Sequence, residues 1–352
     1  MSDASVLKTS FCSLVGVRHP IVQTGMGWVS GARLTAATSQ AGAFGILAAA
    51  TMSFEELHAA IDEVQSRTSA PFGVNLRADQ PDVAARVQLL VDRKVRLASF
   101  AGAPRRDLID RLKEHGVLTM PTIGAPRHAE KMSEWGVDAL IAQGHEGGGH
   151  TGPVPTSLLL PKVTEIVDIP VLGAGGFYDG RGLVAALAWG AAGVAMGTRF
   201  LLTQESTVPD AVKARYLDAR LTQTVVTRAV DGHPQRVIQT PVVRSLERSG
   251  ALGGVFRAIR HALAFRKVTG ASVFALLREG LSMRKTQELT WSQLLMAANA
   301  PMLTRASMVE GLPETGILPT GQVTGLIEEL PTVAELIARM IAEAEETLTR
   351  LR

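Results

Sequence analysis

The segment 139–152, ALIAQGHEGGGHTG, brings together the residue types needed for proton transfer beside a bound ligand. An apolar run ends in Gln143, and three successive glycines then lead to His150. Backbone without side chains can approach a ligand closely, so we expect this loop to contact a bound group. Because an imidazole exchanges protons near neutral pH, we predict that His150 is a catalytic acid or base.

A second histidine, His145, stands earlier in the same loop, before the glycines. We expect a structural or exposed side chain there, and a catalytic role is the alternative; His145 is also a predicted substrate contact. The segment 147–152, GGGHTG, also matches the G-x-G-x-x-G pattern of dinucleotide-binding proteins. Pro153 and Pro155 follow where that pattern should open a helix, so we set this interpretation aside.

Two further glycine-rich turns are suited to holding a phosphate. They lie in VLGAGGFYDGRG (171–182) and GVAMGTRF (193–200). Gly175 and Gly176 would let backbone N–H groups approach a phosphate near a helix N-terminus. Gly197 and Thr198 would add N–H groups and a hydroxyl. Either turn alone could be an ordinary strand-to-helix connection, but the pair favours a phosphate site.

Two amide side chains, Asn75 and Gln143, stand at the ends of apolar runs. Amides in such positions can hydrogen-bond a flat heteroaromatic ring. Asn75 could instead cap a helix. With the glycine-rich turns and His150, these amides indicate a site around a bound cofactor.

Eight short apolar runs recur along residues 20–200 and predict the strands that position these residues. Stretches with helical periodicity separate them, among them 54–65, 84–94 and 105–116. Eight such units predict an α/β fold, a (β/α)8 or TIM barrel, whose functional face lies at the carboxyl ends of the strands. A doubly wound sheet is the alternative. The predicted strands are 20–25, 44–49, 72–76, 96–102, 117–124, 139–144, 169–176 and 193–200.

The pattern changes after residue 200. Residues 208–300 read mostly as helix, with a break at DGHPQR (231–236). Residues 331–351 have the spacing of an amphipathic helix, which we expect to pack back on the barrel. We therefore predict a barrel core at 1–225, a helical C-terminal subdomain or lid at 226–318, and a C-terminal helix within 319–352.

Composition limits the functions that are open. The chain has 352 residues, a formal net charge of +3 and one cysteine, Cys12. That charge is too weak to predict nucleic-acid binding. One cysteine excludes a disulfide framework and a cysteine-based metal site. We predict no metal site, no signal peptide and no membrane span, and hence a cytoplasmic protein.

Basic residues are concentrated between 241 and 287, where nine lysines and arginines accompany two glutamates. This stretch could be a solvated helical face. It could instead bind an anionic substrate such as an acyl-CoA. In that case Arg257, Arg260 and Arg266 are the predicted substrate contacts.

In four segments the chain resembles the nitronate monooxygenase, or 2-nitropropane dioxygenase-like, flavoproteins. These are FMN-binding TIM barrels that also include a flavin-dependent enoyl-acyl-carrier-protein reductase. The resemblance runs from about residue 10 to residue 205, and weakly to the end of the chain through 321–322. The matching segments are HPIVQTGMGWVSG (19–31), PFGVNL (71–76), IAQGHEGGGHTG (141–152) and GAGGFYDGRGLVAALAWGAAGVAMGTRF (173–200).

The resemblance implies that FMN is the cofactor and that His150 is the catalytic histidine. It also implies that the turn after the first strand lies beside the flavin ring. With the glycine-rich turns described above, the predicted FMN contacts are Gly25, Met26, Gly27, Asn75, Gln143, Gly148, Gly149, Gly175, Gly176, Ala195, Met196, Gly197 and Thr198.

Two departures from the nitronate enzymes indicate one branch of this family. Those enzymes typically have Ala-Pro-Met-Gly after the first strand, whereas this chain has Thr-Gly-Met-Gly at 24–27, followed by Trp28. The family's Glu-Ala-Gly-Gly-His is Glu-Gly-Gly-Gly-His at 146–150, so the loop can sit closer to a bulky substrate. The whole chain, including 284–303, most resembles an actinobacterial branch associated with breakdown of steroid C and D rings as CoA thioesters.

The resemblance therefore implies an FMN-dependent oxidoreductase acting on a polycyclic acyl-CoA of the hydroxy-indane-carboxyl type, with Trp28 and His145 as further substrate contacts. Hydride would pass between the substrate and flavin N5 while His150 gives or takes a proton. Oxidation of alkyl nitronates with oxygen is one alternative, and reduction of an enoyl thioester with NAD(P)H is another. NAD(P)H is a candidate electron partner, and a homodimer is a candidate assembly.

Overall fold

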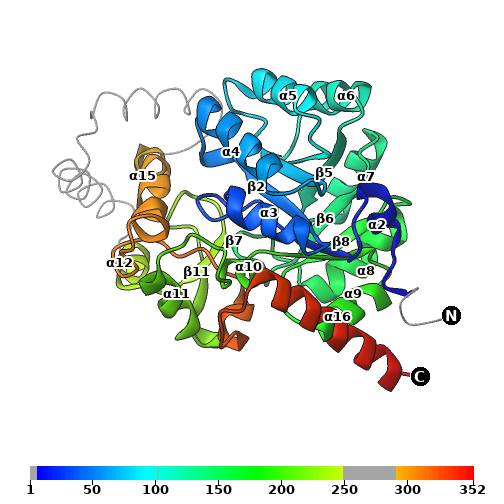
Figure 1. Cartoon of the computed structure of the whole chain (residues 1–352). Coiled ribbons are helices and arrows are strands. Elements are labelled where there is room, and N and C mark those ends of the chain that lie inside the picture. Colours follow the sequence, from blue (N-terminus) through cyan, green and yellow to red (C-terminus); the bar gives the residue numbers. More distant parts are fainter. Residues whose placement is uncertain (1–5, 101, 249–290) are drawn as a thin grey trace.

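Eight parallel strands close into a barrel in the computed structural model, which describes residues 6–100, 102–248 and 291–352 (Figure 1). The barrel closes where β1 pairs with β9, with Val22 opposite Ala195. Each predicted strand is confirmed, and closure excludes the doubly wound alternative. The strands are β1 Ile21–Gln23, β2 Phe44–Ala48, β3 Phe72–Leu76, β4 Leu97–Phe100, β5 Leu118–Ile123, β6 Leu140–Gln143, β8 Val171–Ala174 and β9 Gly193–Met196.

A helix follows each barrel strand and covers the outside of the barrel. In α4, for example, Ser53 and Glu56 form a capping box at the start, and Leu57, Ile61 and Val64 are buried one helical turn apart. The short α2, Ser10–Val15, precedes the barrel. The covering helices are α3 Ala32–Gln40, α4 Phe54–Arg67, α5 Val83–Asp92, α6 Arg106–Glu114, α7 Pro126–Glu134, α8 Thr156–Ile166, α9 Gly180–Ala188 and α10 Thr198–Leu201.

A small antiparallel sheet stands outside the barrel, in the order β10–β11–β7. Its strands are β7 Gly149–His150, β10 Thr224–Thr227 and β11 Gln235–Ile238. The prediction that 208–300 is mostly helical is therefore wrong for 224–227 and 235–238, and its part at 249–290 lies outside the described residues. Adjacent β-branched residues favour strand at 224–227, and the predicted break at 231–236 covers the end of the hairpin turn and the first two residues of β11.

Helices surround this hairpin in the later part of the chain. They are α11 Asp210–Leu217, the 3-10 helix η2 Leu221–Gln223, α12 Pro241–Arg248 and α15 Trp291–Met308. The predicted substrate contacts Arg257, Arg260 and Arg266 lie outside the described residues. The proposed domain boundaries stay predictions, and β10 crosses the one placed after residue 225.

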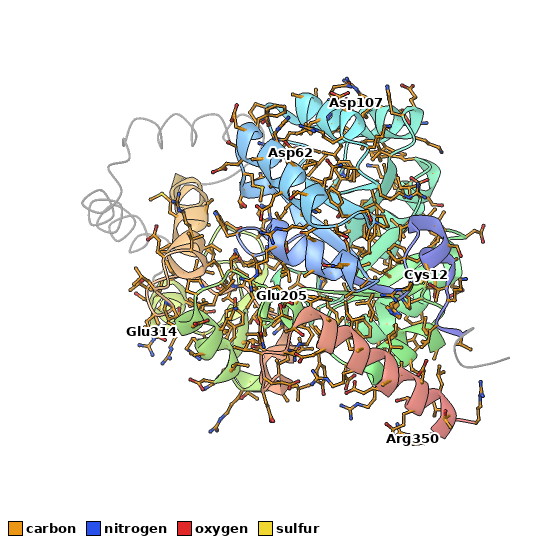
Figure 2. The ribbon with its side chains drawn as sticks, in the orientation of Figure 1. Cys12, Asp62, Asp107, Glu205, Glu314 and Arg350 are labelled. Carbon is orange, nitrogen blue, oxygen red and sulfur yellow. The ribbon has the colours of Figure 1, made fainter. Side chains whose placement is uncertain are left out.

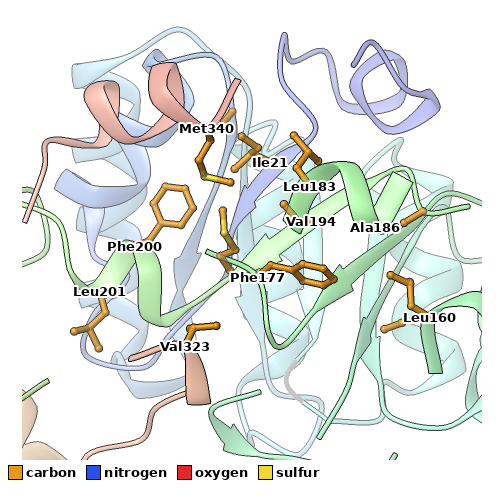
Figure 3. Close-up of a cluster of buried hydrophobic side chains, with 14 of the residues drawn as sticks. Ile21, Leu160, Phe177, Leu183, Ala186, Val194, Phe200, Leu201, Val323 and Met340 are labelled. Carbon is orange, nitrogen blue, oxygen red and sulfur yellow. The ribbon is translucent and has the colours of Figure 1, made fainter. Parts of the chain in front are cut away.

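The C-terminal helix α16, Val333–Arg350, lies against α9 and α3 (Figure 1). A side-chain carbon at Gly180 would lie 2.3 Å from the Met340 carbonyl oxygen, so α9 and α16 approach closely at this glycine. Met340 joins residues of the barrel wall and α9, such as Ile21 and Leu183, in the largest apolar cluster (Figure 3). Within the described residues, no helix is long and apolar enough to cross a membrane.

Candidate active site

The predicted cofactor contacts gather at the carboxyl ends of the strands, beginning with the turn after β1. A side-chain carbon at Gly25 would lie 2.4 Å from Cβ of Asn75, so the two residues are in contact and only glycine fits. Asn75, 6% exposed, donates from Nδ2 to Oγ of Ser99 at 3.1 Å. This geometry leaves the Asn75 oxygen as a fixed acceptor on the β3 side of the barrel mouth.

The turn at 24–30 is held by its own side chains. Ser30 Oγ accepts from the Met26 N–H at 2.9 Å and donates to the Thr24 carbonyl at 2.8 Å. Trp28 adopts a left-handed backbone with φ of 60°, and its N–H donates to Thr51 Oγ1 at 3.2 Å. A bulky residue with positive φ is strained, which singles out Trp28 at this rim.

The turns after β1 and β9 lie side by side. A side-chain carbon at Gly197 would lie 3.2 Å from the Met26 sulfur. Ala195 and Met196, at the end of β9, are buried within the barrel wall. The structure therefore brings the predicted contacts from both ends of the barrel sequence to one side of its mouth.

The turn after β8 forms a second wall of this mouth. Gly175 and Gly176 have φ of 90° and 86°, a backbone region that favours glycine. A side-chain carbon at Gly175 would lie 2.9 Å from the Gly147 nitrogen, so the loops after β6 and β8 are in contact. Thr156 Oγ1 donates to the Gly175 carbonyl at 2.9 Å and fixes this turn to the start of α8.

The C-terminal segment 320–322, which the sequence did not assign to the site, lies against the loops after β6 and β9 and completes the rim of the mouth. The Gly321 N–H donates to Thr198 Oγ1 at 2.9 Å, and the Gln322 N–H donates to the Glu146 carbonyl at 3.0 Å. A side-chain carbon at Gly148 would lie 2.5 Å from the Thr320 carbonyl carbon. The only signal in the sequence was the weak resemblance at 321–322, which assigned no role to these residues.

His150 lies on β7, where it pairs with Gln235 of β11. Gln143 Nε2 donates to the His150 carbonyl at 2.7 Å, which joins the end of β6 to the histidine. The His150 side chain is 65% exposed, and its Nε2 lies 2.7 Å from Oδ2 of Asp231. The ring of His233 meets the His150 ring edge-on at a centroid distance of 6.0 Å.

Asp231 is the functional candidate that the sequence did not reveal. Burial raises the pKa of its carboxyl, but the hydrogen bond and charge of His150, with hydrogen bonds from the His233 backbone and Gln235, together hold the pKa below its ordinary value. The residue stands in the break at 231–236 and reaches His150 only because the hairpin folds back on β7. An Asp-Gly-His sequence in a turn was the available signal.

His145 is bound into the loop by its ring and its backbone. The ring donates from Nδ1 to the Gly152 carbonyl at 2.8 Å. Its own carbonyl accepts from Nη2 of Arg236, a residue that is 4% exposed. Burial lowers the Arg236 pKa, and the charge of Glu146 partly offsets that effect. This geometry matches a structural histidine, and a contact between His145 and substrate stays a prediction.

The chain has matches along nearly its full length. The nitronate monooxygenase family model matches residues 8–86 and 83–343. The chain belongs to the nitronate monooxygenase family. Among the described residues, no group of three or more His, Cys, Asp or Glu side chains is arranged to hold a metal.

Two relatives of this family member are named "(3aS,4S,5R,7aS)-5-hydroxy-7a-methyl-1-oxo-octahydro-1H-indene-4-carboxyl-CoA dehydrogenase", and each is 56% identical to it. The one from Rhodococcus jostii is matched over 99% of this chain and 98% of its own. The one from Mycobacterium tuberculosis is matched over 96% of each chain. FabK from Thermotoga maritima superposes with a TM-score of 0.79 at 34% identity, covering 98% of both chains. The predicted family and the predicted enzyme class, an oxidoreductase, are confirmed.

Proposed function

We propose that this chain is an FMN-dependent dehydrogenase of a polycyclic acyl-CoA, a hydroxylated indane-carboxyl-CoA like that named for its relatives. The observation that carries the proposal is the 56% identity to those dehydrogenases over nearly the whole of both chains. The site geometry supports it, because the predicted flavin contacts and His150 meet at one mouth of the barrel.

The residues at the mouth fit FMN at both of its ends. The turns at 175–176 and 197–198 offer backbone N–H groups, and a helix starts at Thr198. Thr198 Oγ1 accepts from Gly321, so its hydroxyl hydrogen can donate to a phosphate oxygen. Asn75 and Gln143 would hydrogen-bond the flat ring. A bound flavin supplies a two-electron acceptor for hydride at N5.

His150 would move the proton in this reaction. Dehydrogenation removes a proton and a hydride, and the proton beside a thioester carbonyl is the acidic one. His150 is exposed at the end of a loop whose neighbouring Gly149 has open space around its α-carbon. The imidazole is thus open to a substrate and would accept its proton. Trp28, across the mouth on the β1 turn, would contact the apolar rings.

An anaerobic titration tests this proposal. Oxidised protein is titrated with the hydroxy-indane-carboxyl-CoA and, separately, with propionate-3-nitronate, and the flavin band near ~450 nm is followed. Bleaching by the CoA ester alone would support the proposed dehydrogenase. Bleaching or a semiquinone signal with the nitronate alone would favour nitronate oxidation, which is the second candidate because the family model bears that name. Protein that takes up no FMN would contradict both.

Replacing His150 with alanine tests its role. The general base is lost, so turnover of the CoA ester should fall roughly 10²–10⁴-fold. FMN should still bind, because the predicted FMN contacts are other residues. Steady-state turnover per bound flavin measures the effect, and unchanged turnover would show that His150 is not the base. Reduction of enoyl thioesters by NAD(P)H, the remaining alternative, can be assayed on the same preparations.

A further inference from the structure

The histidine at this site is supported by a hairpin that lies outside the barrel. Pro234 is the last residue of the hairpin turn, directly before β11. Its carbonyl accepts a hydrogen bond from the Thr151 N–H at 3.1 Å. Together with the pairing of His150 and Gln235, this contact fixes the backbone on both sides of the imidazole. The turn between β10 and β11 then brings Asp231 to His150 Nε2 at 2.7 Å.

Asp231 is better fixed than the histidine it contacts. Its Oδ1 accepts from the His233 N–H at 3.0 Å, and the Gln235 side chain also hydrogen-bonds the carboxylate. The Asp231 side chain is 14% exposed, whereas that of His150 is 65% exposed. The carboxylate is therefore anchored within the hairpin, and the imidazole is the more exposed of the two partners.

Other ionisable groups around the loop are engaged elsewhere. The Arg236 guanidinium donates to the His145 carbonyl and to Thr224 Oγ1. Glu146 Oε2 accepts from the Thr156 N–H at 2.9 Å and lies 2.8 Å from the Thr156 hydroxyl oxygen. His233 meets His150 through ring contact alone. Among the described residues, Asp231 is thus the carboxylate that binds the imidazole.

We propose that Asp231 is the positioning residue for His150. By holding Nε2 of the His150 ring, it leaves Nδ1 of His150 as the atom that exchanges the proton with the substrate. This inference rests on the proposed function. A neutral imidazole carries one N–H, and a carboxylate beside Nε2 favours the form protonated there. Nδ1 is then left with the lone pair that accepts the substrate's proton. The imidazolium formed in that step lies beside a carboxylate, which stabilises it.

The substitution Asp231→Asn in the FMN-loaded enzyme tests the inference. We expect kcat for the CoA ester to fall about 10- to 100-fold with KM close to the wild-type value, because the carboxylate acts through the histidine and not on bound substrate. In 15N-histidine-labelled protein, the His150 ring nitrogens should lose the shifts of the Nε2–H form. In a His150→Ala background, Asp231→Asn should have no further effect.

A matched control is available on the outside of the barrel. Asp62 of α4, labelled in Figure 2, also contacts a histidine: its Oδ2 lies 3.3 Å from Nδ1 of His58, and its Oδ1 pairs with Arg93. Asp62→Asn removes the same kind of contact far along the helix from the mouth, and should leave kcat and the His150 signals unchanged. Asp231→Glu, which keeps the carboxylate, should recover part of the lost kcat.

The outcomes separate this inference from the function on which it rests. If His150→Ala turns over as fast as wild type, the catalytic histidine and the role of Asp231 are both wrong. If His150→Ala is slow but Asp231→Asn keeps the wild-type kcat per bound flavin, the proposed function stands and Asp231 is a structural contact only. Loss of thermal stability with unchanged His150 ring shifts would overturn the inference in the same way.

Discussion

At the scale of single residues, two features define the candidate site: glycines that pack directly against neighbouring residues, and one bulky residue with an unfavourable backbone conformation. Gly25 touches Asn75, Gly148 touches Thr320, and Trp28 keeps a left-handed backbone. The first two contacts explain why glycine stands where it does. The third is a cost, because a bulky residue with positive φ is disfavoured. Strain of this kind persists where the side chain serves another purpose, here the proposed contact with the polycyclic substrate.

Two truncations of Trp28 separate the backbone cost from the role of the indole. Trp28→Ala and Trp28→Gly remove the same ring, but glycine tolerates a φ of 60° and alanine does not. We expect the free energy of unfolding, measured in urea, to be about 1 kcal/mol higher for Trp28→Gly than for Trp28→Ala. Both should raise the KM for the CoA ester and leave the Kd for FMN unchanged. An unchanged KM in both variants would argue against a substrate contact.

At the scale of elements, the barrel could be predicted and the hairpin could not. Buried parallel strands are continuous apolar runs, such as FGILA at 44–48, and each can be recognised without knowing its neighbours. Strand β7 has only two residues, and β11 begins with Gln235 and Arg236, so neither carries an apolar signal of its own. They are strands because they pair with each other, and this pairing joins segments that lie far apart in the sequence.

The same distinction divides the site residues. His150 was predictable because its own loop is unusual in sequence. Asp231 is 81 positions away in the chain from the imidazole it binds, and Gly321 is 123 positions from Thr198. No local pattern reports such a contact. The roles of the predicted flavin and substrate contacts stay predictions. The structure places the residues predicted to contact flavin around one mouth of the barrel.

Arg236 should be essential for the hairpin to hold the histidine loop. Arg236→Ala removes donors from the His145 carbonyl and from Thr224 Oγ1 and leaves a gap at a buried position. We expect the free energy of unfolding to fall by roughly 2–4 kcal/mol, measured in urea. Arg105→Ala, at an exposed arginine that pairs with Asp107, should change it by less than about 0.5 kcal/mol. Similar values for the two variants would contradict this role of Arg236.

At the scale of the whole molecule, the last part of the chain ties the site together. Tyr216 of α11 donates its hydroxyl to the Pro319 carbonyl at 2.8 Å, and the Thr320 N–H donates to the Arg236 carbonyl at 3.2 Å. The next residue, Gly321, reaches Thr198 at the start of α10. The segment 319–321 therefore joins α11, the β10–β11 hairpin and the start of α10 beside the proposed phosphate site. A ligand seated there contacts elements from both ends of the sequence, so its binding should stabilise the molecule globally.

The thermal stability of flavin-free protein tests that coupling and the phosphate assignment together. A ligand that binds only the folded state adds about 2.7 kcal/mol to the free energy of unfolding at a concentration one hundred times its Kd. We expect FMN to raise Tm and riboflavin, which lacks the phosphate, to raise it clearly less at the same concentration. Thr198→Val removes the hydroxyl proposed to meet the phosphate and should narrow the difference between the two flavins. Equal shifts with FMN and riboflavin in the wild-type protein would show that the turns at 175–176 and 197–198 do not bind a phosphate, because that group is the only part of FMN that riboflavin lacks.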